Sequence, residues 1–296
     1  MPKVFDRMVK VDIWIGIGTL LSYGLAARTD LYTEMSRTNP PQLLTPTNSR
    51  PALSQIQLVA TDMDGTLTEK GAFTAELLAS FDRLRSHKVN ILIVTGRSAG
   101  WVSGLVNYLP VVGAIAENGG LYIDRANLEP VILPDIPRLT HHRDRLSSFF
   151  NRLKDRYPEL IPSVDNPYRI TDWTFDIANL DASDLAWMQE TCEAQAIGFT
   201  YSTVQCHIKI PRQSKAAGLT KVLQQRFPHL TAEQIVTVGD SPNDESLFEE
   251  QFPHSVGVAN IARYLPTLSE SPTYLTANDE AKGFIELVDY LVASKR

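Results

Sequence analysis

The chain has 296 residues, of which 43% are hydrophobic and 21% are charged, and its formal net charge is −6. This length and composition are typical of a globular protein with room for two domains. The acidic balance argues against nucleic-acid binding, which needs clustered basic residues. The two cysteines, Cys192 and Cys206, lack the spacing of a zinc site, so we expect a reduced, cytoplasmic protein in which both are buried.

Residues 1–54 differ from the rest of the chain. The apolar stretch from Ile13 to Ala27 follows basic residues and resembles a signal-peptide core, but it is shorter than the roughly 20 residues of a membrane span. Residues 36–54 are rich in Pro, Thr, Asn and Ser, which indicates a linker. Three interpretations compete: a secretion or anchoring segment, a docking helix, and an upstream extension before a start at Met35. We expect a poorly ordered extension with no stable membrane span and no part in catalysis.

From residue 55 onward, short apolar strands alternate with amphipathic helices, which is typical of α/β domains. The expected strands span residues 56–60, 89–94, 111–116, 235–238 and 254–258. Helices with one apolar face are expected near residues 74–84, 219–227 and 284–292. The pattern predicts a Rossmann-like parallel sheet with helices on both faces, built from residues 55–120 and 206–296.

Residues 121–205 break this rhythm. They contain two amphipathic helices, and strand-like pieces lie around these helices. The pieces span residues 120–123, 128–132, 173–177, 199–201 and 205–210. We therefore expect a small α+β domain that is inserted into the larger one.

Two aspartates, Asp62 and Asp64, follow the first predicted strand and precede Gly65, which lets the backbone turn sharply. Side chains alternate along a strand, so both carboxylates point to the same side. They repel each other unless a cation neutralises them, and Mg²⁺ is the natural oxygen-binding candidate. Taken alone, such a turn is as often a simple connection between a strand and a loop.

Three further motifs follow strands or begin a helix. Thr95 and Gly96 close the second strand with a hydroxyl group and a backbone that can offer N–H groups to an anion. A later strand ends before Asp240 and Asp244, which are four residues apart, and Lys215 begins the helix after the inserted domain. Ligands of open parallel sheets bind beyond the carboxyl ends of the strands, so these motifs can converge there.

This mixture of side chains fits phosphoryl transfer, which depends on positioning and charge neutralisation. One carboxylate can act as nucleophile and form an acyl phosphate, while a second protonates the leaving alcohol and later activates water. Mg²⁺, Lys215, the Thr95 hydroxyl and nearby N–H groups would stabilise the developing charge. Each motif alone has a structural explanation, such as a turn, a surface lysine or a helix cap, but their common order argues against coincidence.

The four motifs resemble the signature motifs of the haloacid dehalogenase superfamily of phosphohydrolases, and the resemblance extends over about residues 55–294. The matching positions are residues 62–66, 95–97, Lys215 and residues 239–244. The insert at residues 121–205 resembles the α/β cap of the Cof-like branch, which includes sucrose-phosphate and mannosyl-3-phosphoglycerate phosphatases. Residues 117–120 are similar to that branch's entry to the cap. Ala216 is a mild departure, because many members have glycine after the lysine.

The resemblance implies a role for each motif residue. Asp62 would be the nucleophile and Asp64 the general acid and base. The residues that bind the phosphoryl group would be Thr95, Gly96, Lys215 and Asn243. The ligands of Mg²⁺ would be Asp62, the backbone carbonyl of Asp64, and Asp240, with Asp244 in or near the metal shell.

Substrate selection would fall to the cap, which covers the site and excludes water. The candidate residues are Asn118, Arg169, His207 and Lys209, with Tyr168 and Trp173 beside them. For each of them, a purely structural part in the sheet or surface of the cap is an equally good explanation.

We therefore expect a Mg²⁺-dependent phosphatase that hydrolyses a small phosphorylated metabolite, in the first place a sugar phosphate. A phosphomutase of the same superfamily is the nearest alternative, because phosphomannomutases share this chemistry and cap type. A non-catalytic metabolite-binding protein is a further alternative, but it predicts a missing catalytic residue and the motif set is complete. The sequence leaves the oligomeric state and the particular phosphate ester open.

Overall fold

The structure is a computed structural model that describes residues 40–295, except residue 178. The apolar stretch Ile13–Ala27, with its three competing interpretations, lies outside the described residues. Across the part of the chain that is described, no helix has both the length and the apolar character needed to cross a membrane.

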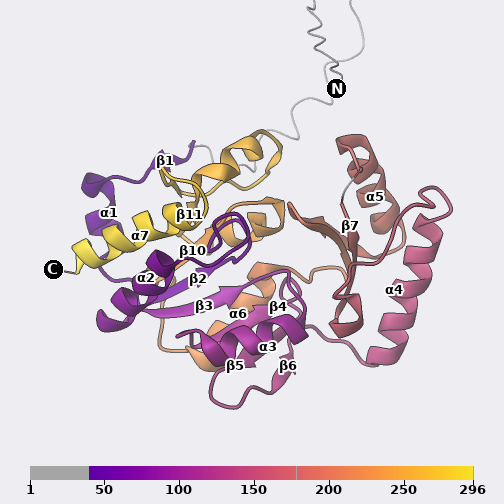
Figure 1. Ribbon diagram of the computed structural model, residues 1–296, viewed down its shortest axis with the longest axis horizontal. Helices are drawn as coiled ribbons and strands as arrows, with labels where there is room; N and C mark the ends of the chain where they lie inside the picture. The colour runs from indigo at the N-terminus through magenta and orange to yellow at the C-terminus, as the bar shows by residue number, and fades with distance from the viewer. Residues whose placement is uncertain (1–39, 178, 296) are drawn as a thin grey trace, which may run out of the picture. The chain divides into compact units, whose positions relative to one another are not determined.

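The larger sheet has nine strands. The short apolar strands that were predicted from the sequence form its centre. Across the sheet, the order is β1 (Gln42–Leu43), β12 (Tyr274–Leu275), β11 (His254–Gly257), β10 (Ile235–Gly239), β2 (Leu58–Thr61), β3 (Asn90–Val94), β4 (Gly113–Ala116), β5 (Leu121–Asp124) and β6 (Pro130–Ile132). The strands from β1 to β4 in this order run parallel, whereas β5 and β6 are antiparallel additions at one edge (Figure 1). The predicted α/β fold with a Rossmann-like parallel sheet is confirmed.

Helices cover both faces of this sheet because its central strands are apolar on both sides. On β2, the side chain of Val59 packs against the helices on one face of the sheet, and the side chains of Leu58 and Ala60 pack against the helices on the opposite face. The first face carries α1 (Pro46–Leu53), α2 (Ala75–Ser86), α3 (Ala99–Tyr108) and α7 (Glu280–Ser294). The second carries α6 (Lys215–Arg226), η3 (Pro242–Phe248) and η4 (Ala259–Arg263). Short turns of 3₁₀ helix also occur at η2 (Ala232–Gln234) and η5 (Leu265–Thr267).

One prediction was wrong for the residues just before β2. Residues 40–54, expected to be a linker, contain β1, which pairs with β12, and α1, which packs on α7. The hydroxyl of Thr45 accepts the N–H of Asn48, and the side-chain Oδ1 of Asn48 accepts the N–H of Thr45 at 2.8 Å. Pro46 occupies the first turn, where a missing N–H costs nothing. The residue types that indicated a linker are therefore the ones that start a helix.

A second sheet with three antiparallel strands lies in the order β7 (Asp172–Asp176), β9 (Gln205–Lys209) and β8 (Gly198–Tyr201). Helices α4 (Leu139–Leu153) and α5 (Ala182–Ala194) pack on its apolar face, and the short η1 (Asn166–Tyr168) precedes β7. We call residues 139–209 the small lobe (Figure 1). Both cysteines are buried in it, as the sequence predicted.

The small lobe differs from the predicted insert at both ends. Residues 121–132 were assigned to the insert, but β5 and β6 extend the nine-stranded sheet, with β5 antiparallel to β4. Residues 206–209 were assigned to the larger domain, but they lie in β9 of the second sheet. A short apolar run identifies a strand, yet nothing in its period says which sheet it joins.

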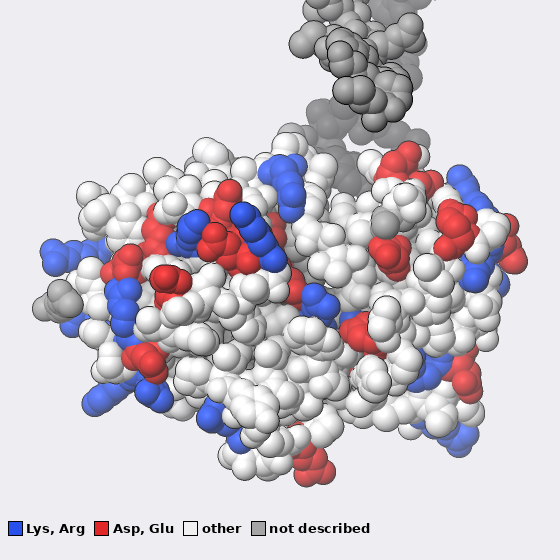
Figure 2. Space-filling view, viewed as in Figure 1, with Lys and Arg blue, Asp and Glu red and all other residues white. Residues whose placement is uncertain are grey.

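Positive and negative side chains are interspersed on the face shown in Figure 2, with no broad basic patch.

Candidate active site

Four adjacent strands of the large sheet, β10, β2, β3 and β4, end at the same edge and deliver the predicted motifs there. Asp240 follows β10, Asp62 follows β2, and Thr95 follows β3. Asn118 lies two residues beyond β4, so it belongs to the large sheet and not to the small lobe. The carboxyl edge of a parallel sheet is where such folds bind ligands.

Lys215 joins the first and last of the acidic motifs. It is the first residue of α6, whose start is capped by Ser214. Its Nζ donates to Oδ1 of Asp62 at 2.5 Å and to Oδ1 of Asp244 at 2.5 Å, and the lysine is fully buried. Burial alone would lower the pKa of Lys215, but the carboxylates of Asp244 and Asp62 raise it above its ordinary value. The ammonium group therefore stays charged between them.

Three buried carboxylates share this single ammonium group. Oxygen atoms of Asp62, Asp240 and Asp244 lie within 4.8 Å of one another. Burial, followed by the charge of Asp244, raises the pKa of Asp62 to about 7. Burial and the charge of Asp62 likewise raise the pKa of Asp240 well above its usual range. The excess negative charge and the all-oxygen donor set fit a hard divalent cation.

Gly65 allows the backbone to approach this cluster closely. Its φ is +85°, and a Cβ added there would lie 2.4 Å from Oδ2 of Asp240. The same oxygen accepts from the amide of Asn260 at 2.8 Å, which also donates to the carbonyl oxygen of Gly65. Only glycine combines this conformation with the missing side chain.

Asp64 lies beside Asp62 in sequence but has a different partner. Arg97 donates to both of its carboxylate oxygens, through Nε at 2.8 Å and Nη2 at 2.7 Å. Arg97 also stacks on the ring of Trp101, which holds the guanidinium group in place. Thr95 is buried, and its hydroxyl accepts the N–H of Arg97 at 3.1 Å. The arrangement separates the two aspartates, one bound to a lysine and the other to an arginine.

The side chains of Asn118 and Asn243 meet between the ends of β4 and β10. Nδ2 of Asn243 donates to Oδ1 of Asn118 at 3.0 Å, and Oδ1 of Asn243 accepts from the Ser241 hydroxyl at 2.8 Å. Nδ2 of Asn118 is buried and has no hydrogen-bond partner among the described residues. This amide donor remains free for a ligand.

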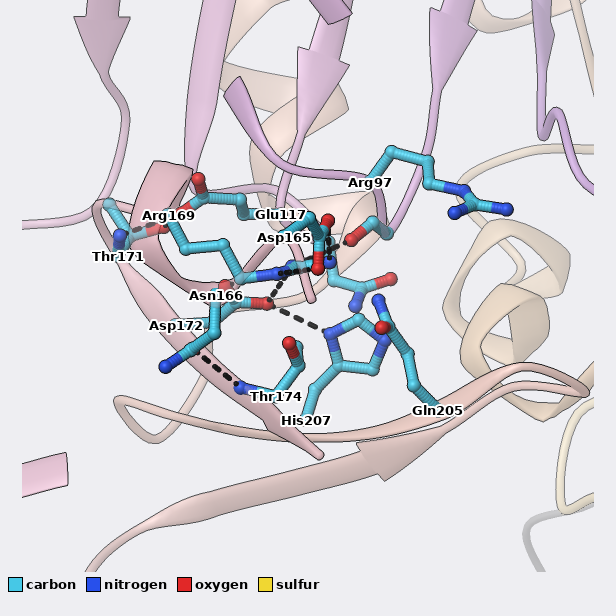
Figure 3. Close-up of polar contacts among 12 residues, drawn as sticks. Arg97, Glu117, Asp165, Asn166, Arg169, Thr171, Asp172, Thr174, Gln205 and His207 are labelled. Atoms are coloured by element: carbon cyan, nitrogen blue, oxygen red, sulfur yellow. Dashed lines mark hydrogen bonds and ion pairs between the residues drawn. The ribbon is translucent and has the colours of Figure 1, made fainter. Parts of the chain in front are cut away.

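The small lobe faces these motifs with a buried polar network (Figure 3). Nδ1 of His207 lies 2.8 Å from Oδ2 of Asp172, and Nη1 of Arg169 donates to both oxygens of Asp172 at 3.0 Å. Burial opposes ionisation of Asp172, but Arg169 and then His207 lower its pKa to about 2. Burial lowers the pKa of His207 to about 4. The ring is therefore neutral at pH 7, with its proton on Nδ1 toward the carboxylate.

The two lobes are in contact beside the candidate nucleophile. His207 lies against Gly96, where an added Cβ would be 3.2 Å from Nε2. The space left between the lobes there has a volume of about 20 Å³. Its walls are Asp62, Asp64, Thr95, Gly96, Arg97, Ser241 and Asn243 from the large sheet, and Ser202, Val204, Gln205 and His207 from the small lobe. A volume of this size holds about one water molecule.

Two family models match most of the described chain. The model for haloacid dehalogenase-like hydrolases matches residues 59–140, and the model for sucrose-6F-phosphate phosphohydrolase matches residues 177–291. The chain belongs to the haloacid dehalogenase superfamily of phosphohydrolases. The resemblance to this superfamily that the four motifs suggested is confirmed. The prediction that the protein is a phosphoric monoester hydrolase is also confirmed.

Curated relatives and solved structures agree with this family. The hydrolase is 25% identical over 240 residues to the phosphoglycolate phosphatase of Methanothrix thermoacetophila, covering 81% of this chain and 98% of the relative. It is 28% identical over 241 residues to phosphoglycolate phosphatase 1 of Saccharolobus solfataricus, covering 80% and 96%. A Thermoplasma acidophilum protein shares its fold with a TM-score of 0.66 at 18% identity, covering 80% of this chain and 98% of that one. The C-terminal domain of Candida albicans trehalose-6-phosphate phosphatase shares it with a TM-score of 0.64 at 16% identity, covering 86% and 99%.

Arg169 was predicted to bind substrate, but its guanidinium group is bound to other residues of the protein. It is buried, and it donates to the carbonyl oxygen of Gly96 at 2.9 Å as well as to Asp165 and Asp172. Its guanidinium group therefore holds the small lobe against the end of β3. Tyr168, beside it, is 65% exposed. The other candidates from the small lobe, His207 and Lys209, do face the larger sheet.

Glu117 is a site-bordering residue that sequence reasoning missed. Its buried carboxylate accepts the N–H groups of Ala99 at 3.2 Å, Ile170 at 3.0 Å and Thr171 at 2.6 Å. It also accepts the Thr171 hydroxyl at 2.7 Å. The residue connects the end of β4 with α3 and the small lobe (Figure 3). The sequence around Glu117 could not predict these contacts. Two of its partners are backbone N–H groups 53 and 54 residues away, and no local pattern encodes such a distant contact.

Proposed function

We propose that this phosphatase hydrolyses a small phosphate monoester through a phosphorylated Asp62, with Mg²⁺ as its metal ion. The observation that supports this most directly is the contact of Lys215 with Asp62 and Asp244, beside the Asp240 carboxylate. A nucleophilic carboxylate next to a fixed cation and a metal-binding cluster is what attack on an anionic phosphorus requires.

The steps can be assigned to the residues of this chain. An Asp62 oxygen attacks phosphorus, and the bond from phosphorus to the leaving alcohol oxygen breaks as Asp64 gives that oxygen a proton. Asp64 then takes a proton from water, and the resulting hydroxide attacks phosphorus. The bond between phosphorus and the Asp62 oxygen breaks, which releases inorganic phosphate and restores the Asp62 carboxylate. Arg97 holds Asp64 in place, while Thr95, Gly96, Lys215 and Asn243 bind the phosphoryl oxygens.

The residues that would hold Mg²⁺ are Asp62, the backbone carbonyl of Asp64, and Asp240. Asp244 would border the metal, because its Oδ1 accepts from Lys215 and its Oδ2 accepts the N–H groups of Asp240 and Ser241. When bound, the ion would neutralise charge that develops on the phosphoryl oxygens. The raised pKa values of Asp62 and Asp240 support this assignment, since a divalent cation would favour their ionised forms.

The small lobe would act as a cap on a catalytic core that is formed by the nine-stranded sheet and its helices. Its polar face supplies His207 and Gln205 to the walls of the space over Asp62. A lobe in this position excludes bulk water while the acyl phosphate exists.

Two substrate classes have support. The match to the sucrose-6F-phosphate phosphohydrolase model favours a sugar phosphate, and the relatives named phosphoglycolate phosphatases favour a phosphorylated two-carbon acid. We place sugar phosphates first and 2-phosphoglycolate second.

Phosphate release from a panel of both classes, with Mg²⁺ and after chelation, tests the proposal. We expect release by the native protein with Mg²⁺, and at least a 1,000-fold loss in Asp62→Asn because the nucleophile is removed. The matched control is Asp82→Asn, an exposed aspartate paired with Arg85. Equal activity in Asp62→Asn and the native protein would contradict the assignment, and phosphate that stays on the sugar would indicate a phosphomutase.

A further inference from the structure

A second cavity, of about 530 Å³, lies beside the candidate active site between the small lobe and the start of α6. Its walls include Asn118, Thr200, Lys209, Gln213, Lys215 and Asn243. The volume lies in the range of cavities that bind small metabolites. It exceeds what a phosphoryl group needs, so the rest of a substrate can occupy it.

Lys209 is the unusual residue of this cavity. It lies at the end of β9 and is 5% exposed, yet its ammonium group has no hydrogen bond or ion pair with any described residue. The carboxylate of Asp172, across the strand pair, is already bound by Arg169 and His207. Burial lowers the pKa of Lys209 to about 8 more strongly than Asp172 raises it. A buried charge without a partner is unfavourable unless a ligand supplies one.

The acidic residues of the cavity wall do not serve as that partner. The carboxylate of Glu193 accepts from the amide of Gln189. The carboxylate of Glu245 accepts the N–H groups of Ser269 and Glu270. Two buried atoms of the wall, Nδ2 of Asn118 and Oε1 of Gln213, lack partners among the described residues. The cavity thus offers polar groups that are prepared for a ligand.

The cavity also connects with the reacting atoms. Asn243 borders both the 530 Å³ cavity and the smaller space over Asp62. His207 and Lys209 lie on the same face of β9, two residues and about 6–7 Å apart. A phosphate ester with its phosphorus at Asp62 would extend along this face, and a chain of a few atoms would bring its far end to Lys209.

We propose that Lys209 binds a second anionic group, a carboxylate or another phosphate, on the leaving alcohol of the substrate. The proposal rests on the proposed function and changes its ranking of substrates: phosphorylated acids, and sugar phosphates that carry a second anionic group, come before neutral sugar monophosphates. Hydroxyl groups alone would leave the buried ammonium charge unbalanced, whereas an anion forms a charge-assisted hydrogen bond with it. The substrate would be a phosphorylated acid or a bisphosphate in preference to a neutral alcohol phosphate.

Binding to the Asp62→Asn protein tests this proposal, because that variant is expected to bind without turnover. Calorimetry in the presence of Mg²⁺ would compare glycerol 3-phosphate, 3-phosphoglycerate and glycerol 1,3-bisphosphate as probes of equal chain length. In Asp62→Asn/Lys209→Met, we expect Kd to rise at least tenfold for the carboxylate or the bisphosphate, and less than threefold for glycerol 3-phosphate. Whichever probe shows the larger change identifies the anionic group.

Two further variants control the experiment. Lys209→Arg keeps the charge and should retain most of the preference, whereas Lys154→Met removes a partly exposed lysine of the same lobe and should leave all three Kd values unchanged. Replacing an unpaired buried charge with an apolar side chain should not unfold the protein, and thermal unfolding checks this. Equal losses for all three probes, or no loss, would overturn the proposal.

The outcomes distinguish this inference from the proposed function. If the native protein releases no phosphate from any ester but the binding preference depends on Lys209, then the proposed reaction is wrong. If the native protein hydrolyses esters and Lys209→Met leaves the preference for acidic substrates intact, then only the role of Lys209 is wrong.

Discussion

At the scale of single residues, the two aspartates after β2 differ through their partners. Asp62 contacts Lys215, whereas Asp64 is held by two hydrogen bonds from Arg97. A carboxylate that must give and take a proton has to stay near the leaving oxygen, and the fork of Arg97 fixes it there.

Removing this support should slow the reaction more than it weakens binding. We expect Arg97→Met to lower kcat about 100-fold, because a misplaced acid loses its reach to the leaving oxygen. Steady-state kinetics on the best ester of the panel measures kcat and KM. Arg85→Met is the control, since Arg85 forms an exposed pair with Asp82. A kcat within threefold of the native value would show that Arg97 does not position Asp64.

Sequence reasoning found the motif residues but missed Arg97 and Glu117 as site residues. Asp62, Asp240 and Lys215 could be predicted because each follows a strand or begins a helix at a fixed edge of the sheet. The partners of Arg97 and Glu117 depend on how loops fold over that edge. No periodicity in the chain encodes those contacts.

At the scale of elements, the polar face of the β7 and β9 pair carries a histidine whose charge state is set by burial. His207 has a pKa of about 4 in the folded protein, below its ordinary 6.5. The unfolded chain therefore takes up a proton first as pH falls. His207 should destabilise the fold between pH 6.5 and 4 and have little effect above pH 7.

The pH dependence of unfolding tests this directly. Between pH 7 and pH 4 the native protein should lose about 3 kcal/mol more unfolding free energy than His207→Asn, which keeps a donor to Asp172 but cannot be protonated. Urea denaturation at the two pH values measures the difference. His229→Asn, at an exposed position, should behave as the native protein does. Identical pH responses in all three proteins would refute the assignment.

Glu117 connects β4, α3 and the small lobe through acceptor oxygens alone. Glu117→Gln should lower the unfolding free energy by about 2 kcal/mol, because its amide would turn N–H donors toward the N–H groups of Ile170 and Thr171. Urea denaturation at pH 7 measures the loss. Glu159→Gln, exposed in the small lobe, is the control and should change stability by less than 0.5 kcal/mol. An equal effect of both variants would argue against this connection.

At the scale of the whole molecule, residues 40–54 belong to the fold. Leu53 is fully buried against the sheet and α7, so Leu53→Ala should cost about 3 kcal/mol of unfolding free energy. Leu43→Ala, in β1 of the same segment, alters a side chain that is 55% exposed and should cost far less. Thermal or urea unfolding of both variants distinguishes a packed element from a linker. Equal, small losses would restore the linker interpretation.

The sequence predicted the central strands and the motifs that follow them, but it did not predict where the insert begins and ends. Strands β2, β3 and β10 have nearly continuous apolar runs, which are typical of a buried parallel sheet. The runs that form β5 and β9 look alike in sequence, yet one extends the large sheet and the other builds the small lobe. Sheet membership depends on contacts distant in sequence, which a local pattern does not contain.

The narrow space beneath His207 imposes an order of events on the proposed reaction. A phosphate ester is larger than the volume of about 20 Å³ there, so we expect the lobes to part for each substrate and to close before Asp62 reacts. The dephosphorylated alcohol then either departs before water attacks or remains and takes the phosphoryl group back on another oxygen. A hydrolase and a mutase can thus share every side chain described here and differ only in how long the two lobes stay shut.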